Sequence, residues 1–110
     1  MGCMILHNDD VALKPIGNGC ARKVLSYNKD MMMVEVHCEK GGEGAIHTHP
    51  HVQCTYVRSG LFEFTVDGKN VIVGPGDSLC FEPNVPHGTL CLEKGVLIDC
   101  FTPMREDFLK

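Results

Sequence analysis

Short runs of β-forming residues, separated by glycine and proline, limit the folds open to this chain more than any other feature of its sequence. The clearest signal is Asp67-Gly68, a pair typical of a two-residue type I′ hairpin, between β-forming runs at 61–66 and 70–73. Further short runs lie at 24–27, 31–36, 46–48, 53–57, 78–81, 88–92 and 96–101. Short strands at this spacing predict an all-β fold, either a sandwich or a closed barrel.

The segments between these runs predict where the chain turns. Turns are expected at 59–60, 74–76 and 93–95, where glycine recurs. Only the end of the chain has a helical pattern: Thr102 could cap a short helical turn and Pro103 suits its first position. No linker, repeat or low-complexity segment divides the 110 residues, so we expect a single domain over residues 1–110.

Charge and composition argue against several classes of protein. The formal charge is −4 at pH 7, which argues against a nucleic-acid partner. No apolar run approaches the ~18 residues of a membrane span, and the N-terminus lacks the basic and apolar regions of a signal peptide. The seven cysteines include no C-x-x-C pair, so we expect reduced structural thiols in a cytoplasmic protein.

Histidines gather in a segment that is rich in glycine and contains one proline. His47 and His49 are two residues apart, so on one strand they would face the same side. His51 and Gln53 share that parity, but Pro50 interrupts strand pairing and predicts a bend. Parity alone therefore does not choose between His51 and Gln53 as a further ligand.

A fourth histidine, His87, follows a second segment punctuated by glycine and proline, which begins at Gly74-Pro75-Gly76. Neutral imidazole is the commonest protein ligand of catalytic divalent metals. An isolated histidine is usually a surface or satisfied core residue. The pairing of His47-x-His49 with His87 in this setting instead predicts a metal site with room for a substrate.

The last β-forming run contains one charged residue, Asp99, among apolar neighbours. The period of a strand places Leu97, Asp99 and Phe101 on one face. A carboxylate on an apolar face needs a partner or a chemical function. Two alternatives stay open: a structural ion pair with Arg105, or proton transfer by Asp99 while the planar fork of Arg105 binds a substrate carboxylate. Phe101 by itself is more typical of a core residue than of a sugar-stacking platform.

The first histidine segment resembles a known motif. The spacing Gly41-x5-His47-x-His49-x3-Gln53-x6-Gly60 is similar to the first motif of the cupin family, with Gln53 where cupins usually have glutamate. The resemblance implies a single cupin β-barrel, which is a double-stranded β-helix or jelly-roll-like fold of two packed sheets.

The second segment matches the second cupin motif more loosely, as Gly76-x5-Glu82-x-Asn84-x2-His87. Glu82 stands where proline is usual, and Asn84 replaces the usual glycine. The combined resemblance maps the metal ligands to four residues and leaves His51 near the rim of the site. These ligands are His47, His49, Gln53 and His87.

Gln53 changes the chemistry that such a site would have. Three imidazoles and an amide are all neutral, so a bound divalent cation keeps its charge of about +2 and is a stronger Lewis acid than it would be beside a carboxylate. Zinc, nickel, cobalt, iron and manganese all fit these ligands, and ligand identity does not choose among them.

Across nearly its full length the chain resembles a narrower group, the pectin-degradation cupins called KdgF, which linearise unsaturated uronates. One matching stretch, Asp99-x-Phe101-x-Pro103-x-Arg105-Glu106-Asp107-Phe108, is not a general cupin feature. The resemblance places Asp99, Phe101 and Arg105 at the substrate site of that family.

That resemblance implies an enzyme of the unsaturated pyranuronate lyase type. Its reaction would be metal-dependent ring opening and tautomerisation of 4,5-unsaturated uronic acid monosaccharides, derived from pectin or alginate, to linear keto-uronates. Its partner would be a small anionic sugar acid, and similar cupins often pair, so we expect a homodimer. Two rivals are a cupin dioxygenase acting on a small organic acid or thiol, against which the missing glutamate counts, and a non-enzymatic sugar- or metal-binding module.

Overall fold

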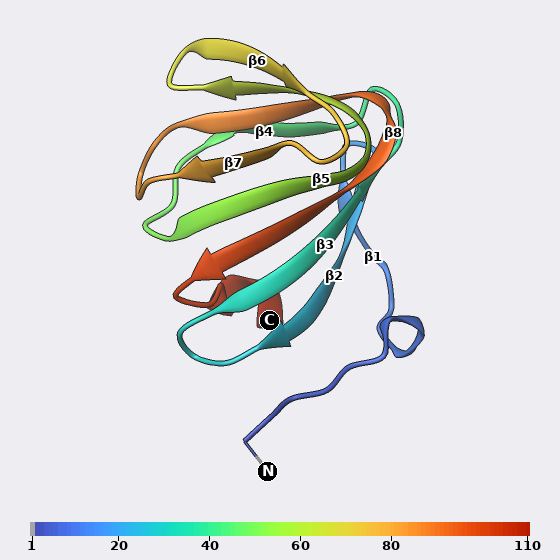
Figure 1. Cartoon of the computed structure of the whole chain (residues 1–110), viewed down its shortest axis with the longest axis vertical. Helices are drawn as coiled ribbons and strands as arrows, with labels where there is room; N and C mark the ends of the chain where they lie inside the picture. The colour runs from blue at the N-terminus through green and yellow to red at the C-terminus, as the bar shows by residue number, and fades with distance from the viewer. Residues whose placement is uncertain (1) are drawn as a thin grey trace.

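The computed structural model describes residues 2–110 and consists almost entirely of antiparallel β-strands (Figure 1). Eight strands make one sheet in which the order β1-β2-β3-β8-β5-β6 forms the main path. The strands are β1 (Lys14–Gly17), β2 (Cys20–Tyr27), β3 (Met32–Cys38), β4 (Glu43–His47), β5 (Val52–Val66), β6 (Lys69–Val73), β7 (Ser78–Phe81) and β8 (His87–Thr102). Two short 3₁₀ helices, η1 (Asn8–Asp10) and η2 (Glu106–Leu109), lie near the two ends of the chain.

Two long strands, β5 and β8, turn this sheet into a two-layered barrel. The first half of β5 pairs with β7 and with the second half of β8, which also pairs with β3. The second half of β5 pairs with β6 and with the first half of β8, which also pairs with β4. Each long strand therefore belongs to both layers, and Figure 1 shows the layers curving around a common interior.

The two long strands bend where Gly60 on β5 closely approaches Gly95 on β8. Gly60 on β5 has φ of +83°, and a Cβ atom there would lie 2.6 Å from backbone atoms of Glu93, Lys94 and Gly95. The register between β5 and β8 shifts at the same place, between Val57 and Phe62. A side chain at Gly60 would thus collide with the facing strand, so glycine is required where the sheet folds over.

The expected β-rich architecture is confirmed, with corrections at several boundaries. The Asp67-Gly68 hairpin is present, and both residues have positive φ, as a type I′ turn requires. The turns expected at 59–60 and 93–95 are instead bends within continuous strands, because each glycine-containing segment stays paired with the other. The strand β1 was not predicted. The C-terminal helical turn is 3₁₀ and begins at Glu106, without the expected cap by Thr102.

Apolar side chains fill the barrel in two clusters. Phe101 packs with Met32 and Val34 near the C-terminal turn, together with Phe108 of η2. The larger cluster is made of Cys38, Val57, Phe62, Phe64, Val73, Phe81, Cys91 and Leu97. Leu97, Asp99 and Phe101 all line the interior, which confirms that the three share one face of the last strand.

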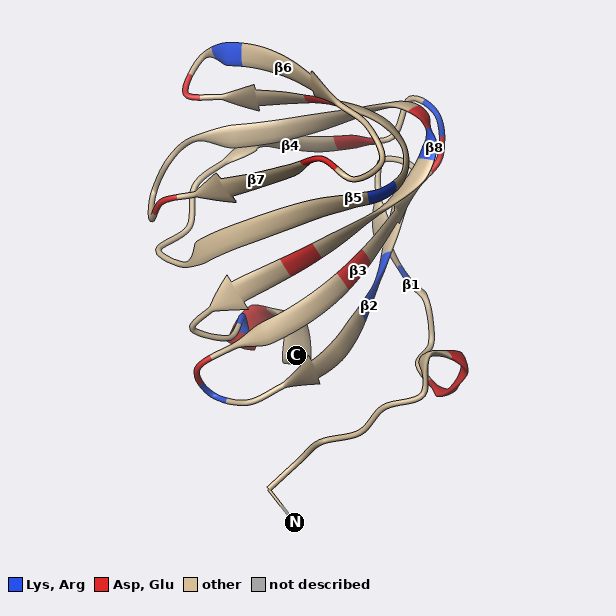
Figure 2. Cartoon of the chain, in the orientation of Figure 1, with Lys and Arg blue, Asp and Glu red and all other residues tan. Residues whose placement is uncertain are grey.

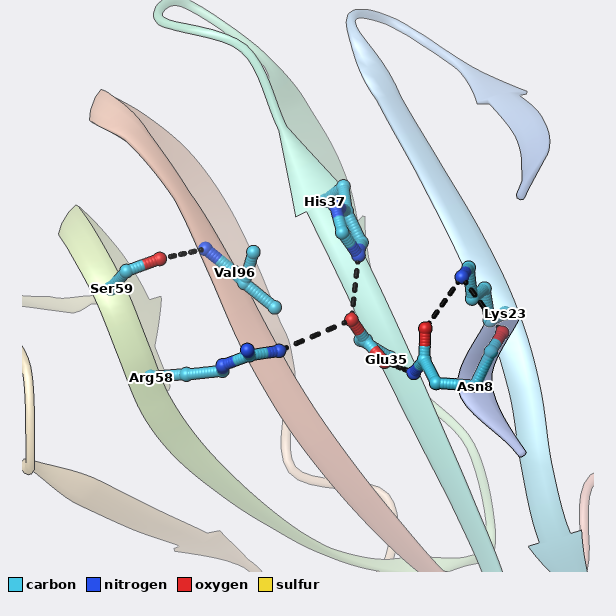
Figure 3. Close-up of polar contacts among 7 residues, drawn as sticks. All are labelled: Asn8, Lys23, Glu35, His37, Arg58, Ser59 and Val96. Carbon is cyan, nitrogen blue, oxygen red and sulfur yellow. Dashed lines mark hydrogen bonds and ion pairs between the residues drawn. The ribbon is translucent and has the colours of Figure 1, made fainter. Parts of the chain in front are cut away.

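A buried carboxylate on the outer face of β3 ties the N-terminal segment to the sheet (Figure 3). Glu35 is 3% exposed. The side-chain amide of Asn8 in η1 donates a hydrogen bond of 2.6 Å to Glu35, and Nε2 of His37 lies 2.8 Å from the same carboxylate. Arg58 approaches at 3.4 Å, and Lys23 donates to Asn8. Hydrogen bonds and nearby positive charge outweigh burial and lower the pKa of Glu35.

Replacing Glu35 with Gln is expected to lower the free energy of unfolding by roughly 1–3 kcal/mol, because an amide cannot accept from all of these donors at once. Since the pKa of Glu35 is lowered, its ionised form stabilises the fold above the ordinary pKa of 4.5, and that stability is lost as pH falls through the folded-state value. Urea denaturation at several pH values measures this. The exposed Glu93 gives a matched control, Glu93→Gln. Equal effects of the two substitutions would contradict the role given to Glu35.

Charged residues are interspersed over the molecule in the view of Figure 2, with Lys and Arg positions near Asp and Glu positions. The overall charge is −4. Positive potential for an anionic ligand must therefore come from positive groups close to its site. Among residues 2–110, no helix has the length and apolar character required to cross a membrane.

Candidate metal centre and active site

A cavity of about 240 Å³ opens inside the barrel and is lined by residues of β2, β3, β4, β5 and β8. His47, at the end of β4, and His87, at the start of β8, are directly paired across these two strands. Gln53 on β5 also lines the cavity. His49 lies in the loop after β4, so the expectation that His47 and His49 share one strand is wrong. The loop nevertheless brings all three imidazoles together.

Nitrogen atoms of His47, His49 and His87 lie within 4.8 Å of one another. Each ring is oriented by a backbone carbonyl at its Nδ1: Ala45 at 2.8 Å for His47, His51 at 3.1 Å for His49, and Val85 at 2.9 Å for His87. A carbonyl only accepts, so each Nδ1 carries the proton and each Nε2 keeps its lone pair. The three rings are therefore held in the tautomer that binds a metal through Nε2.

Two further contacts fit a cation at this point. Nε2 of His87 is buried and has no hydrogen-bond partner among the described residues. Nε2 of His49 lies 2.8 Å from Oε1 of Gln53, although both atoms are acceptors when His49 is protonated at Nδ1. An orphaned acceptor and two facing acceptors are unfavourable without a positive charge beside them. The residues present fit a divalent cation held by His47, His49, His87 and Gln53.

His51 is outside this cluster, as expected from the resemblance. Its ring is half-buried, and its centroid lies 5.5 Å from that of His49. Its backbone carbonyl, rather than its imidazole, acts on the cluster by orienting His49. Burial lowers the pKa of His87, and the neighbouring His47 and His49 lower it further, which favours the neutral form that a metal requires.

A chain of hydrogen bonds joins the histidine cluster to Asp99. Nε2 of Gln53 donates to Oγ1 of Thr55 at 2.9 Å, and the Thr55 hydroxyl donates to Oδ1 of Asp99 at 2.6 Å. Thr55 was not predicted from the sequence. Its signal was its parity with Gln53, since residues two apart on a strand face the same side. The chain fixes Gln53 with its oxygen toward His49.

Asp99 is 9% exposed and faces the cavity. Burial raises its pKa from 3.8 to about 6, against hydrogen bonds from Thr55 and Gln53 that lower it. A carboxyl group with a pKa near neutrality can both accept and return a proton. Its position in the cavity and its raised pKa are compatible with acid–base chemistry.

Arg105 lines the same cavity, but it pairs with Asp107 rather than with Asp99. Its Nε and Nη2 atoms donate to the two carboxylate oxygens of Asp107 at 3.1 and 2.9 Å. Its guanidinium also lies over aromatic rings, with Cζ 5.1 Å from the centroid of Phe101 and 4.3 Å from that of Phe108. The alternative of a structural Asp99–Arg105 ion pair is therefore wrong.

Comparisons with known proteins agree with this geometry. The family model described as Cupin domain matches residues 34–98. The pectin degradation protein KdgF of Dickeya dadantii (strain 3937) is 41% identical over 104 residues, which are 93% of this chain and 94% of that protein. The solved structure of KdgF from a Halomonas species has a TM-score of 0.92 and 30% identity, with coverage of 96% of this chain and 98% of that one.

A second solved structure, an RmlC-like cupin from Shewanella frigidimarina NCIMB 400, has a TM-score of 0.91 and 40% identity, and the match covers 94% of this chain and 93% of that one. The domain match contains all four expected metal ligands: His47 on β4, His49 in the loop that follows, Gln53 on β5 and His87 on β8. This chain belongs to the cupin family and, within it, to the group of the pectin degradation protein KdgF.

Proposed function

We propose that this protein is a metal-dependent enzyme that opens and tautomerises the ring of 4,5-unsaturated uronic acid monosaccharides, derived from pectin or alginate, to give linear keto-uronates. The observation that carries the proposal is one cavity lined by a buried carboxyl group, by an arginine and by two of the three clustered imidazoles, those of His47 and His87. The likeness to KdgF over most of the chain supports it.

The reaction moves one proton and breaks one ring bond. Loss of the C1 hydroxyl proton lets the bond from C1 to the ring oxygen break, which leaves an aldehyde at C1 and an enolate at C5. Protonation of C4 then converts the enolate to a ketone beside the carboxylate. The product is an isomer of the substrate, so no co-reactant is required.

A divalent cation at His47, His49, His87 and Gln53 would supply Lewis-acid stabilisation of the oxygen on which negative charge develops. We assign the proton transfers to Asp99, which takes the proton from the C1 hydroxyl and returns a proton to C4. Thr55 donates to one Asp99 oxygen and so holds the carboxylate in place. The other carboxylate oxygen of Asp99 would face the sugar.

Arg105 and Phe101 are assigned to binding. Arg105 is 13% exposed at its side chain and has N–H groups beyond those donated to Asp107, which can bind the substrate carboxylate. Phe101 lines the cavity and lies beside His49, with ring centroids 5.7 Å apart. It would form the apolar wall against which the sugar ring lies and would exclude water from it.

The direct test is incubation of metal-loaded protein with the unsaturated monouronate. Absorbance of the alkene conjugated to the carboxylate should disappear faster than in buffer alone, and a chelator should restore the spontaneous rate. Oxygen consumption that depends on bound iron would instead support a cupin dioxygenase. Saturable uronate binding without product would support a non-enzymatic binding module.

The cytoplasmic location, the homodimer and the assignment of residues 1–110 to one domain stay predictions. Sedimentation velocity of the metal-loaded protein measures the oligomeric state directly. The native metal among zinc, nickel, cobalt, iron and manganese is to be identified by elemental analysis of protein purified without added metal.

A further inference from the structure

A second arginine, Arg22, lies in the wall of the candidate active site. It is on β2, where it lines the same cavity as Asp99 and Arg105. Its guanidinium stacks on Phe108 of η2, with Cζ 3.6 Å from the ring centroid. Because stacking fixes the plane of the group without using its N–H donors, these donors stay free for a ligand.

No side-chain partner for these donors is found among the residues that the structure describes. None of the ion pairs among residues 2–110 includes Arg22, and no side-chain hydrogen bond of that region does. Asp107 is the acidic group whose charge acts on Arg22. Both oxygens of its carboxylate accept hydrogen bonds from Arg105. A half-buried guanidinium with no acceptor is an incomplete arrangement, since its five donors lose water on burial.

The charges around Arg22 are of both signs. Burial lowers the pKa of Arg22; the negative Asp107 raises it, and the positive Arg105 lowers it again. Arg22 and Arg105 approach the ring of Phe108, with Cζ at 3.6 and 4.3 Å from its centroid. Because Glu43 and Asp99 also line the cavity, the unused N–H donors of Arg22, and not an excess of positive charge, favour an acceptor at this point.

We propose that Arg22 is a substrate-binding residue whose free guanidinium receives the carboxylate of the uronate, beside Arg105. Phe108 is the positioning residue that holds Arg22 in place. This assignment rests on the proposed function, because it names the group that recognises the acid of that substrate. It also explains how a protein of net charge −4 holds an anion.

The test compares Arg22→Gln, Arg22→Lys and a matched control, Arg58→Gln, in the metal-loaded protein. Arg58 is 62% exposed on the outer face, so its replacement removes the same charge away from the cavity. Arg22→Gln should raise KM by about tenfold or more with a much smaller change in kcat, because the carboxylate contact is made before and during the reaction. Arg22→Lys should recover part of the loss, since it keeps the charge but not the fork. A KM for Arg22→Gln equal to that of Arg58→Gln would overturn the assignment.

A binding measurement separates this assignment from the proposed reaction. Titration of wild type with a saturated hexuronate, and with the matching neutral hexose, should show a preference for the acid that Arg22→Gln loses. Turnover by wild type with an unaltered preference in Arg22→Gln would refute the role of Arg22 alone. Absence of turnover with an Arg22-dependent preference would refute the reaction alone. Thermal unfolding of each variant verifies that it is folded.

A different observation, independent of the substrate, concerns two cysteines in the same wall. Cys20 on β2 and Cys38 on β3 are paired across the strands, and their Sγ atoms lie 2.6 Å apart. The adjacent pair, Gly19 and Glu39, shares a backbone hydrogen bond, so Cys20 and Cys38 occupy a non-hydrogen-bonded position, where facing side chains are closest. That spacing of strands is compatible with a disulfide.

We infer that Cys20 and Cys38 are a site of reversible disulfide formation, with a small-molecule disulfide as oxidant. The thiolate of Cys20, the more exposed of the two, attacks the small disulfide and releases one thiol. The thiolate of Cys38 then attacks the mixed disulfide and releases the second thiol. One small disulfide is reduced to two thiols, and the pair loses two hydrogen atoms.

Treatment of the metal-loaded protein with oxidised glutathione, alkylation of the remaining thiols, and digestion with trypsin and Asp-N should yield peptides 10–22 and 30–40 joined to each other. Reductant should separate them. Cys54 and Cys80, which are paired on β5 and β7, provide an internal comparison because both are exposed. Alkylation of both Cys20 and Cys38 after oxidation, or linkage of Cys54 to Cys80 alone, would overturn the inference. In Cys20→Ser, Cys38 should be recovered in alkylated form.

Discussion

Asp99→Asn is expected to reduce the rate of uronate linearisation by about 10²- to 10⁴-fold, the usual contribution of a positioned acid–base group. The substitution keeps the shape of the side chain, and an amide oxygen can still accept the hydrogen bond that Thr55 donates to Asp99. What it removes is the ability to take a proton. The metal content should stay unchanged, because the four proposed ligands are other residues.

The same substitution should make the metal-free protein more stable at neutral pH. The pKa of Asp99 is raised by burial to about 6 from 3.8, so between these values the folded state holds a proton that the unfolded state releases. The free energy of unfolding therefore falls as pH rises through this window, and above it the buried charge costs about 3 kcal/mol. Asn cannot ionise, so the variant should gain up to that amount above pH 6 and almost nothing below pH 4.

Three measurements check this pair of effects: single-turnover rates, elemental analysis, and urea denaturation of chelator-treated protein at several pH values. Asp30→Asn is the matched control, since Asp30 is exposed. The rate of wild type should also fall at acid pH as Asp99 becomes protonated. Normal turnover in Asp99→Asn would remove this residue from the mechanism. A loss of both turnover and metal would reassign it to the support of the metal site.

The sequence was informative where structure depends on neighbours along the chain. Asp67-Gly68 predicts a hairpin because a type I′ turn depends on two adjacent residues that accept positive φ. Gly60 and Gly95 carry no such information, because a glycine permits both a chain reversal and a bend. Only the close approach of the two strands, which join distant parts of the chain, makes these residues bends within β5 and β8.

The candidate site divides in the same way. His47, His49, Gln53 and His87 could be named from a motif with fixed spacing, and Asp99 from its isolation among apolar residues. The partner of Arg105 could not be predicted in this way, because Asp107 and Asp99 are both near it in sequence. The path of the chain after β8 decides between them. Arg22 was even less accessible, because nothing before folding places β2 beside the C-terminal η2 and Phe108.

His87→Ala is expected to weaken metal binding by at least about 100-fold and to abolish metal-dependent turnover. His87 is 3% exposed, and its Nε2 atom has no hydrogen-bond partner among the described residues. A cation is therefore the group that would satisfy it. Removing a ligand should cost more than the 10- to 100-fold that follows the loss of a residue that only orients a ligand. His51→Ala is the matched control, because His51 lies next to the cluster and contributes its backbone carbonyl, which the substitution keeps.

Thermal unfolding with and without metal gives a measurement that does not depend on activity. A cation that binds only the folded state raises the unfolding temperature with concentration. Wild type and His51→Ala should show this rise, and His87→Ala should lose it while remaining folded, because Phe81 and its apolar neighbours still fill the core beside the position of the lost ring. A full rise in His87→Ala, with stoichiometric metal by elemental analysis, would mean that the cation is held elsewhere. The conflict between the acceptor atoms of His49 and Gln53 would then need another explanation.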